Sequence, residues 1–255
     1  MMPYSFFGAI MFRFLLFLLC MAPLAADGLA DLREALGRFT AKTTVKGTLR
    51  AQQWTTQGKD AAETKGEASA FAEYGPDGLK LSWGSALLRQ LDEEAKARAK
   101  GDPKTNQASI ALWAMEPMRS YAFFDAAGEI SRILETADFR GEGQETFNGR
   151  RARALTFSLP QSGAPERMRR YIKEHSSTAK IWIDEEGNPL GSWRRTEIKA
   201  RAFLVVSFTQ MQEVNMTYAP FGDRLVCLRH DETLEGGGGG EYGKSRSLRT
   251  FSPRP

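Results

Sequence analysis

A glycine run near the end of the chain matches a phosphate-binding pattern. Residues Gly238 to Ser245 read G-G-G-E-Y-G-K-S, which fits the P-loop sequence G-x-x-x-x-G-K-[ST]. A P-loop works where a helix follows the glycines and directs its positive end at the phosphates. Here Ser247 to Phe251 alternates like a strand, and Pro253 follows it. We therefore interpret the run as a hairpin loop and not as a nucleotide site.

The other residue types that perform chemistry form no catalytic or metal-binding pattern. The two histidines, His175 and His230, lie in different segments, and a zinc site needs more nitrogen or sulfur ligands. The acidic run from Asp184 to Asn188 is too short for a calcium-binding EF-hand loop and is typical of a strand turn. The chain has no G-x-S-x-G elbow. We expect a binding protein without enzymatic activity, cofactor or metal; a secreted hydrolase is the alternative, and it would need a cleft that gathers carboxylates.

The stretch from Gly66 to Gly101 is predicted to form a hairpin followed directly by a helix. Gly75-Pro76-Asp77-Gly78 suits a type I turn, and Leu79, Leu81 and Trp83 alternate with polar residues after it. Residues 85–100 then have helical spacing. The apolar stripe of this helix is Leu88, Leu91, Ala95 and Ala99. We expect the helix to cover the concave face of a curved sheet, as a lid.

The rest of the chain predicts a mostly antiparallel protein. A helix is expected over 28–40, a first long strand over 43–54, and a further helix from Pro117 to Ala137. From Gly141 onward the chain reads as strands, with Asn148-Gly149 as the clearest hairpin turn. The sum is about nine to eleven strands and about three helices without βαβ alternation. The expected fold class is α+β, with a curved antiparallel sheet that forms an incomplete β-barrel covered by lid helices.

The amino terminus has the layout of a secretory signal peptide. Arg13 precedes the apolar run from Phe14 to Met21, and small residues up to Ala26 offer a cleavage site. We expect residues 1–26 to be the signal peptide, residues 27–255 to form one domain, and the protein to be periplasmic. An uncleaved membrane anchor and a lipoprotein modified at Cys20 are the alternatives.

Composition limits the partners. The formal net charge is +4, and the basic residues are spread along the chain. Because no aromatic–basic recognition motif accompanies them, we expect no nucleic-acid partner. After signal cleavage Cys227 has no cysteine to pair with, and its apolar neighbours indicate a buried, inert thiol.

The absence of a catalytic pattern makes large apolar residues the candidates for a site. Ordinary core packing is the favoured interpretation for any one of them, whereas the functional interpretation places them around a cavity between sheet and helices. The candidate ligand-binding residues are Leu49, Leu81, Trp83, Leu88, Leu91, Trp113, Tyr121 and Phe124.

The order of elements resembles a known family of periplasmic proteins. The first helix has the form L-x-x-L-x-x-x-L-x-x-F from Leu29 to Phe39, a hairpin ends at Leu81-Ser82-Trp83, and Phe147-Asn148-Gly149-Arg150 joins two later strands. This arrangement resembles the periplasmic carriers of outer-membrane lipoproteins, the LolA/LolB-like superfamily. The resemblance covers most of residues 27–252 and is one of architecture; it transfers no individual functional residue.

The resemblance implies an incomplete barrel whose apolar space, under the helices, holds acyl chains. It further implies a monomeric carrier or sensor of lipids or lipoproteins, with membrane-associated donor and acceptor proteins as possible partners. Residues 100–108, residues 160–176 and the glycine run do not map onto the carriers. The alternative is a periplasmic protein-binding or structural module with the same fold, a filled core and no lipid ligand.

Overall fold

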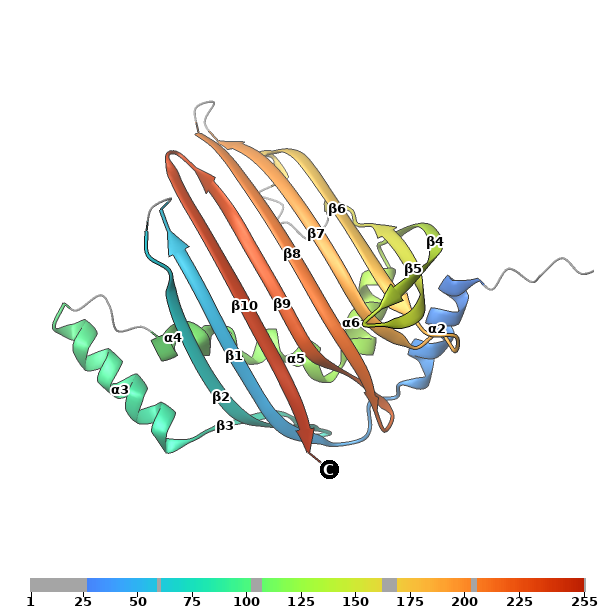
Figure 1. Cartoon of the computed structure of the whole chain (residues 1–255), viewed down its shortest axis with the longest axis horizontal. Coiled ribbons are helices and arrows are strands. Elements are labelled where there is room, and N and C mark those ends of the chain that lie inside the picture. The colour runs from blue at the N-terminus through green and yellow to red at the C-terminus, as the bar shows by residue number, and fades with distance from the viewer. Residues whose placement is uncertain (1–26, 59–60, 102–106, 162–168, 203–205, 255) are drawn as a thin grey trace, which may run out of the picture.

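Ten strands form one antiparallel sheet (Figure 1). The computed structural model describes residues 27–58, 61–101, 107–161, 169–202 and 206–254. The strand order is β3-β2-β1-β10-β9-β8-β7-β6-β5-β4. The strands are β1 (Val45–Gln57), β2 (Thr64–Gly75), β3 (Gly78–Trp83), β4 (Asp138–Phe147), β5 (Arg150–Ser158), β6 (Ile172–Ile183), β7 (Pro189–Ala202), β8 (Val206–Phe221), β9 (Arg224–Gly238) and β10 (Glu241–Arg254). Because β3 and β4 end the order on opposite sides, the sheet is open. The antiparallel sheet predicted from the sequence is confirmed.

Five helices accompany the sheet in the described ranges. They are α2 (Gly28–Arg38), α3 (Ser85–Ala99), α4 (Gln107–Trp113), α5 (Pro117–Phe124) and α6 (Ala126–Leu134). Four of them lie in the connection between β3 and β4, the two outermost strands. This connection therefore has to cross the whole width of the sheet, and α4, α5 and α6 do so along one face (Figure 1).

Side-chain alternation gives the sheet an inner and an outer face. In β1, Val45, Leu49 and Ala51 are buried, whereas Lys46 and Arg50 between them are exposed. The inner face carries the helices: α4 contacts β1 and β2, while α5 and α6 contact β9. The core contains Leu32 and Leu36 of α2, Phe123 and Phe124 of α5, Ile130 of α6, and Leu155, Ile181 and Phe251 of the strands. The inward-facing side chains of the strands and the apolar stripes of the packed helices thus form one core.

The literal P-loop match lies in a β-hairpin, as expected. β9 ends at Gly238, β10 begins at Glu241, and the two are paired from this point onward. Gly240 has a φ of +92°, a backbone conformation that a side chain rarely adopts. The glycine run therefore makes a tight strand connection, and β10 rather than a helix follows it.

The long helix predicted from Pro117 to Ala137 is two helices. Asp125 separates α5 from α6 with a φ of −138°, and its carboxylate accepts a hydrogen bond from the backbone N–H of Gly128 at 3.2 Å. Aspartate is a favoured residue immediately before a helix because its short side chain satisfies a free N–H of the first turn. The continuous apolar stripe concealed this break.

Helix α3 differs most from the expectation. It projects beyond the β3 edge of the sheet and does not cover the inner face (Figure 1). Most of its side chains are exposed, and its one buried residue is Glu94 rather than a leucine. Gly84 occupies the position before the helix, without a side-chain cap. The lid role expected for residues 85–100 is therefore not met in this arrangement, and α4, α5 and α6 cover the sheet instead.

Candidate functional site

Four of the eight candidate residues are exposed apolar side chains. The exposed fractions are 37% for Trp83, 53% for Leu88, 66% for Trp113 and 48% for Tyr121. They come from β3, α3, α4 and α5, which adjoin one another: α3 follows β3 directly, α3 contacts α4, and α5 contacts β3. We call this set, Trp83, Leu88, Trp113 and Tyr121, the apolar edge surface.

Exposure of four large apolar side chains on adjoining elements makes the apolar edge surface unusual. Single exposed apolar residues are normal on a soluble protein, but larger groups of them mark binding sites. Seven large apolar side chains are clearly exposed in the described part of the chain, and four of them belong to this surface. The others are Phe71, Phe139 and Phe208.

The other four candidates lie deeper. Leu49 on β1 and Phe124 on α5 are completely buried in the core. Leu81 is half-buried and packs against that core, and Leu91 is half-buried on α3. The structure therefore does not bring all eight residues around one space, since Leu49 and Phe124 already contact other protein side chains.

Aromatic contacts connect the apolar edge surface to the core. The rings of Tyr74 and Tyr121 meet edge to face with centroids 5.3 Å apart, and Tyr74 stacks on Phe124 at 5.7 Å. Phe124 in turn meets Phe251 at 4.9 Å. A hydrogen bond with Tyr74 raises the pKa of Tyr121 to about 12, so its hydroxyl stays neutral. Tyr121 thus has one side fixed against the core while about half of it faces solvent.

The Glu94 carboxylate ties α3 to α4, together with Arg98 of α3, which donates a hydrogen bond to the Ser109 hydroxyl of α4 at 3.3 Å. Glu94 accepts hydrogen bonds from the backbone N–H of Ala108 at 2.8 Å, from the backbone N–H of Ser109 at 3.1 Å and from the Ser109 hydroxyl at 2.7 Å. The amide of Gln90 donates a further bond at 3.2 Å. Burial by itself would raise the pKa of Glu94, but these hydrogen bonds outweigh it and lower the pKa. The buried charge is therefore satisfied and sits at the start of a helix, where negative charge is favourable.

Two buried arginines tie the sheet to α4 and α5. Arg249 on β10 donates to the carbonyl oxygens of Ala114 at 3.3 Å and Arg119 at 2.9 Å. Arg224 on β9 donates to the carbonyl oxygens of Thr43 and, at 3.4 Å, Phe124. Ala114 and Phe124 lie at the C-terminal ends of α4 and α5, where carbonyls lack partners within their own helix, and the guanidinium groups supply these partners. The position of the helices on the inner face therefore depends on strand side chains.

His230 lies beside the buried guanidinium group of Arg249. Atom Nη2 of Arg249 lies 3.1 Å from each of its ring nitrogens. Burial, followed by the positive charges of Arg249 and Arg194, lowers the pKa of His230 to about 3. A buried imidazole that stays neutral at physiological pH and faces two cations is poorly suited to accept a proton.

The Cys227 thiol and the potential metal ligands of the described residues also show no sign of a reactive site. Burial raises the pKa of the Cys227 thiol to about 12, so it is not a nucleophile, as expected from its neighbours. Within the ranges that the structure describes, no group of three or more His, Cys, Asp or Glu side chains could hold a metal ion.

Sequence reasoning missed the polar residues that position the helices. Glu94 reads as one more charge on the wet face of a helix, and its partners lie beyond a loop. Arg249 gave a usable signal: it lies two residues before Phe251, so it faces the same side of β10 as this core residue. Its burial could have been inferred from that alternation.

Membrane and family comparisons add no further assignment. Among the described residues, no helix combines the length and apolar character needed to span a membrane; the expected signal peptide lies outside them. A scan against protein-family models finds no match to the chain, and searches of curated proteins and of solved structures find none either.

Proposed function

We propose that this protein is an exported, non-enzymatic carrier or sensor that binds acyl chains of lipids or lipoproteins at the apolar edge surface. The observation that carries the proposal is the exposure of Trp83, Leu88, Trp113 and Tyr121 on adjoining elements. Each methylene that such a surface removes from water contributes about 0.8 kcal/mol, so a fatty acyl chain supplies useful affinity without a polar anchor.

Helix α3 is the moving part in this proposal. Apart from its link to β3, the strongest contact that holds it is the Glu94 carboxylate on the first turn of α4. In the loaded state α3 would shift about the Gly84 region so that Leu88 and Leu91 of its apolar stripe contact the acyl chain. Release reverses this movement. The sequence-predicted lid role thus returns as a property of the loaded state.

A second candidate function is a protein-binding module, and the filled core favours it. Leu49 and Phe124 are completely buried against protein side chains, as a module without a lipid cavity requires. The apolar edge surface would then receive an apolar segment of another protein. In both functions we propose a periplasmic monomer, with no nucleic acid involved.

Native mass spectrometry separates the two candidates. The full chain would be produced by export in a bacterial periplasm, purified without detergent, and extracted with organic solvent. A bound species of acyl-chain mass, or saturable uptake of a fluorescent fatty acid, supports the carrier. A clean apo mass together with no uptake overturns it in favour of the protein-binding module.

Variants of α3 make the test specific to the surface. Leu88→Asp, with Leu91→Asp added, should abolish fatty-acid uptake because it places charge where the acyl chain lies. Ala86→Asp is the control for the single variant Leu88→Asp, since it adds one negative charge to an exposed position of the same helix. Equal fatty-acid uptake by both variants would show that α3 does not take part in acyl-chain binding.

A further inference from the structure

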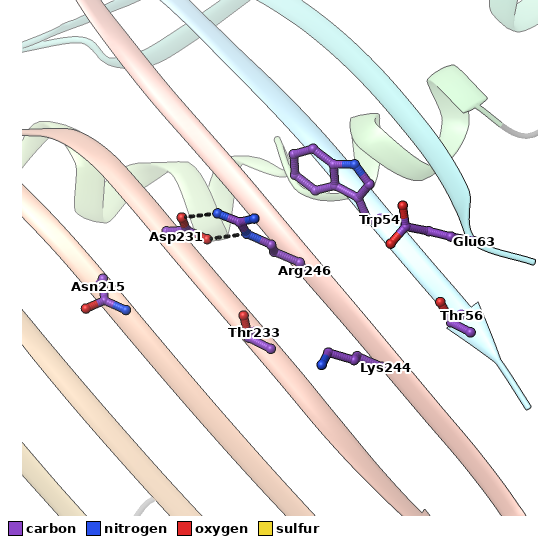
Figure 2. A pocket seen from close by; sticks show the side chains of 8 residues that line it. All are labelled: Trp54, Thr56, Glu63, Asn215, Asp231, Thr233, Lys244 and Arg246. Atoms are coloured by element: carbon purple, nitrogen blue, oxygen red, sulfur yellow. Dashed lines mark hydrogen bonds and ion pairs between the residues drawn. The ribbon is translucent and has the colours of Figure 1, made fainter. Parts of the chain in front are cut away.

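The outer face of the sheet, opposite to the helices, carries a hollow. It has a volume of about 580 Å³, within the range of about 300–1,000 Å³ usual for small-ligand sites. It extends over β1, β10, β9 and β8 (Figure 2). Its lining residues are Trp54, Thr56, Glu63, Asn215, Asp231, Thr233, Lys244 and Arg246. None of them belongs to the apolar edge surface.

Trp54 supplies an apolar platform in this polar hollow. It is half-buried on β1, opposite Lys65 of β2 and Arg246 of β10 in the sheet register. The charged ends of these two side chains lie 5.5 Å from the indole centroid. These cation–π contacts fix the ring from neighbouring strands. The indole is nevertheless only half-buried and lines the hollow, so the part of the ring that the two cations leave uncovered, with hydrogen-bonding groups beside it, can contact the apolar C–H groups of a sugar ring.

Asp231 supplies a fixed acceptor. Arg246 binds it with two parallel hydrogen bonds, Nε to Oδ1 at 2.9 Å and Nη2 to Oδ2 at 2.7 Å, and Arg229 donates to Oδ2 at 2.8 Å. A carboxylate has about four lone-pair sites, so three bonds leave one acceptor position on Oδ1. The Arg246 hydrogen bonds lower the pKa of Asp231, which keeps it ionised.

Amide and hydroxyl groups complete the set. Asn215 on β8 is exposed and lies directly opposite Asp231 in the register, and Thr233 lies opposite Arg246. From Trp54 to Asn215 the hollow crosses three strand spacings, about 14 Å, which exceeds one monosaccharide. Donors and acceptors thus line a path that is longer than one sugar ring, with the aromatic ring at one end (Figure 2).

The charge of the lining selects among polar ligands. Two basic residues, Lys244 and Arg246, are balanced by two acidic ones, Glu63 and Asp231. Lys244 is itself paired with Glu235 at 3.4 Å. A phosphate or sulfate would meet both carboxylates, whereas an uncharged polyol can use donors and acceptors alike. We propose that the outer-face hollow binds a neutral oligosaccharide, with one sugar ring stacked on Trp54 and hydroxyls bonded to Asp231 and Asn215.

Calorimetric titration of the full-chain protein with chitotriose, cellotriose and maltotriose tests this site. We expect saturable binding of at least one of them, with a Kd of about 1 mM or tighter. Trp54→Ala should weaken it at least tenfold and Asn215→Ala severalfold, while Trp54→Tyr should retain most of it. Weaker binding than this by all three sugars, or competition by inorganic phosphate, would overturn the proposal.

Trp113→Ala is the matched control, because it removes an indole from the apolar edge surface instead. It should leave sugar binding unchanged and reduce fatty-acid uptake, whereas Trp54→Ala should do the reverse. Equal sugar binding by Trp54→Ala and the wild type would also overturn the proposal. Melting temperatures of all variants verify that they are folded.

Discussion

The carboxylate of Glu94 accepts a hydrogen bond from the backbone N–H of Ala108 at 2.8 Å, and this contact joins α3 to the first turn of α4. The helix is otherwise largely exposed, with Leu88 facing solvent over more than half of its surface. Few of its side chains are buried, so the helix can be released without unfolding the core, although the Arg98–Ser109 hydrogen bond and the half-buried Leu87 hold it as well as Glu94. Its stability is therefore lower than that of the sheet.

Replacing this carboxylate should loosen α3 alone. Glu94→Gln keeps the size of the side chain but loses the charge, and a hydrogen bond to a charged group contributes about 1.5–3 kcal/mol. We expect amide hydrogen exchange in Ser85–Ala99 to accelerate about tenfold or more while exchange in β9 stays unchanged. Glu93→Gln, on the exposed side of the same helix, is the control. Unchanged protection of α3 in Glu94→Gln would show that other contacts hold it.

Acid should have the same effect as this substitution. The pKa of Glu94 is lower in the folded protein than in the unfolded chain, where it is about 4.3. Its contribution to stability is therefore present above the unfolded value and is lost as the pH falls through the folded value. We expect the protection of α3 to be constant from about pH 7 to pH 5, to begin to fall near the unfolded pKa of about 4.3, and to be lost as the pH falls through the lower folded pKa. If Glu94→Gln shows the same acid transition as the wild type, another group controls it.

Residue patterns could predict the sheet but not the place of α3. Period-two alternation identified the strands, and the Asn148-Gly149 pair identified the β4–β5 turn, because both depend on neighbouring residues only. The stripe of α3 correctly indicated a helix, but a stripe does not say which surface receives it. Glu94 has its partners on α4, across residues 102–106, and such a contact has no signature in local sequence.

The hydrogen-bond partners of the buried arginines could not be predicted from local sequence either. Arg224 and Arg249 look like ordinary strand surface residues, yet they hold the backbone carbonyls of α4 and α5. The alternation of side chains along β10 places Arg249 on the same side as the core residue Phe251. Its hydrogen-bond partners, however, depend on where the connection between β3 and β4 crosses the sheet. The sequence predicts Trp83, Leu88, Trp113 and Tyr121 around a cavity between sheet and helices, whereas in the structure they are exposed.

Removing Arg249 should destabilise the whole domain. Arg249→Met retains apolar packing on Phe123 but leaves the carbonyls of Ala114 and Arg119 without this donor. We expect a loss of about 2–4 kcal/mol in the free energy of unfolding, measured by urea denaturation. Arg50→Met is the control: its ion pair with Glu67 is exposed and contributes at most about 1 kcal/mol. Similar losses for the two variants would contradict the role of Arg249.

His230 should make stability depend on pH above the range of the carboxylates. Burial and the charges of Arg249 and Arg194 lower its pKa to about 3, whereas an unfolded histidine titrates near about 6.5. Between these values the unfolded chain binds a proton that the folded protein does not, so stability falls as the pH decreases from about 6.5. This difference amounts to about 2–3 kcal/mol between about pH 6.5 and pH 4.5.

His230→Gln should remove that part of the pH dependence, because glutamine does not titrate and can still hydrogen-bond Arg249. Urea unfolding of both proteins across this range gives the difference directly, since carboxylates contribute equally to the two curves. His175→Gln removes the other histidine, which lies on β6, and should keep the wild-type slope. A His230→Gln curve parallel to that of the wild type would mean that His230 is protonated in the folded protein, with its charge accommodated beside Arg249.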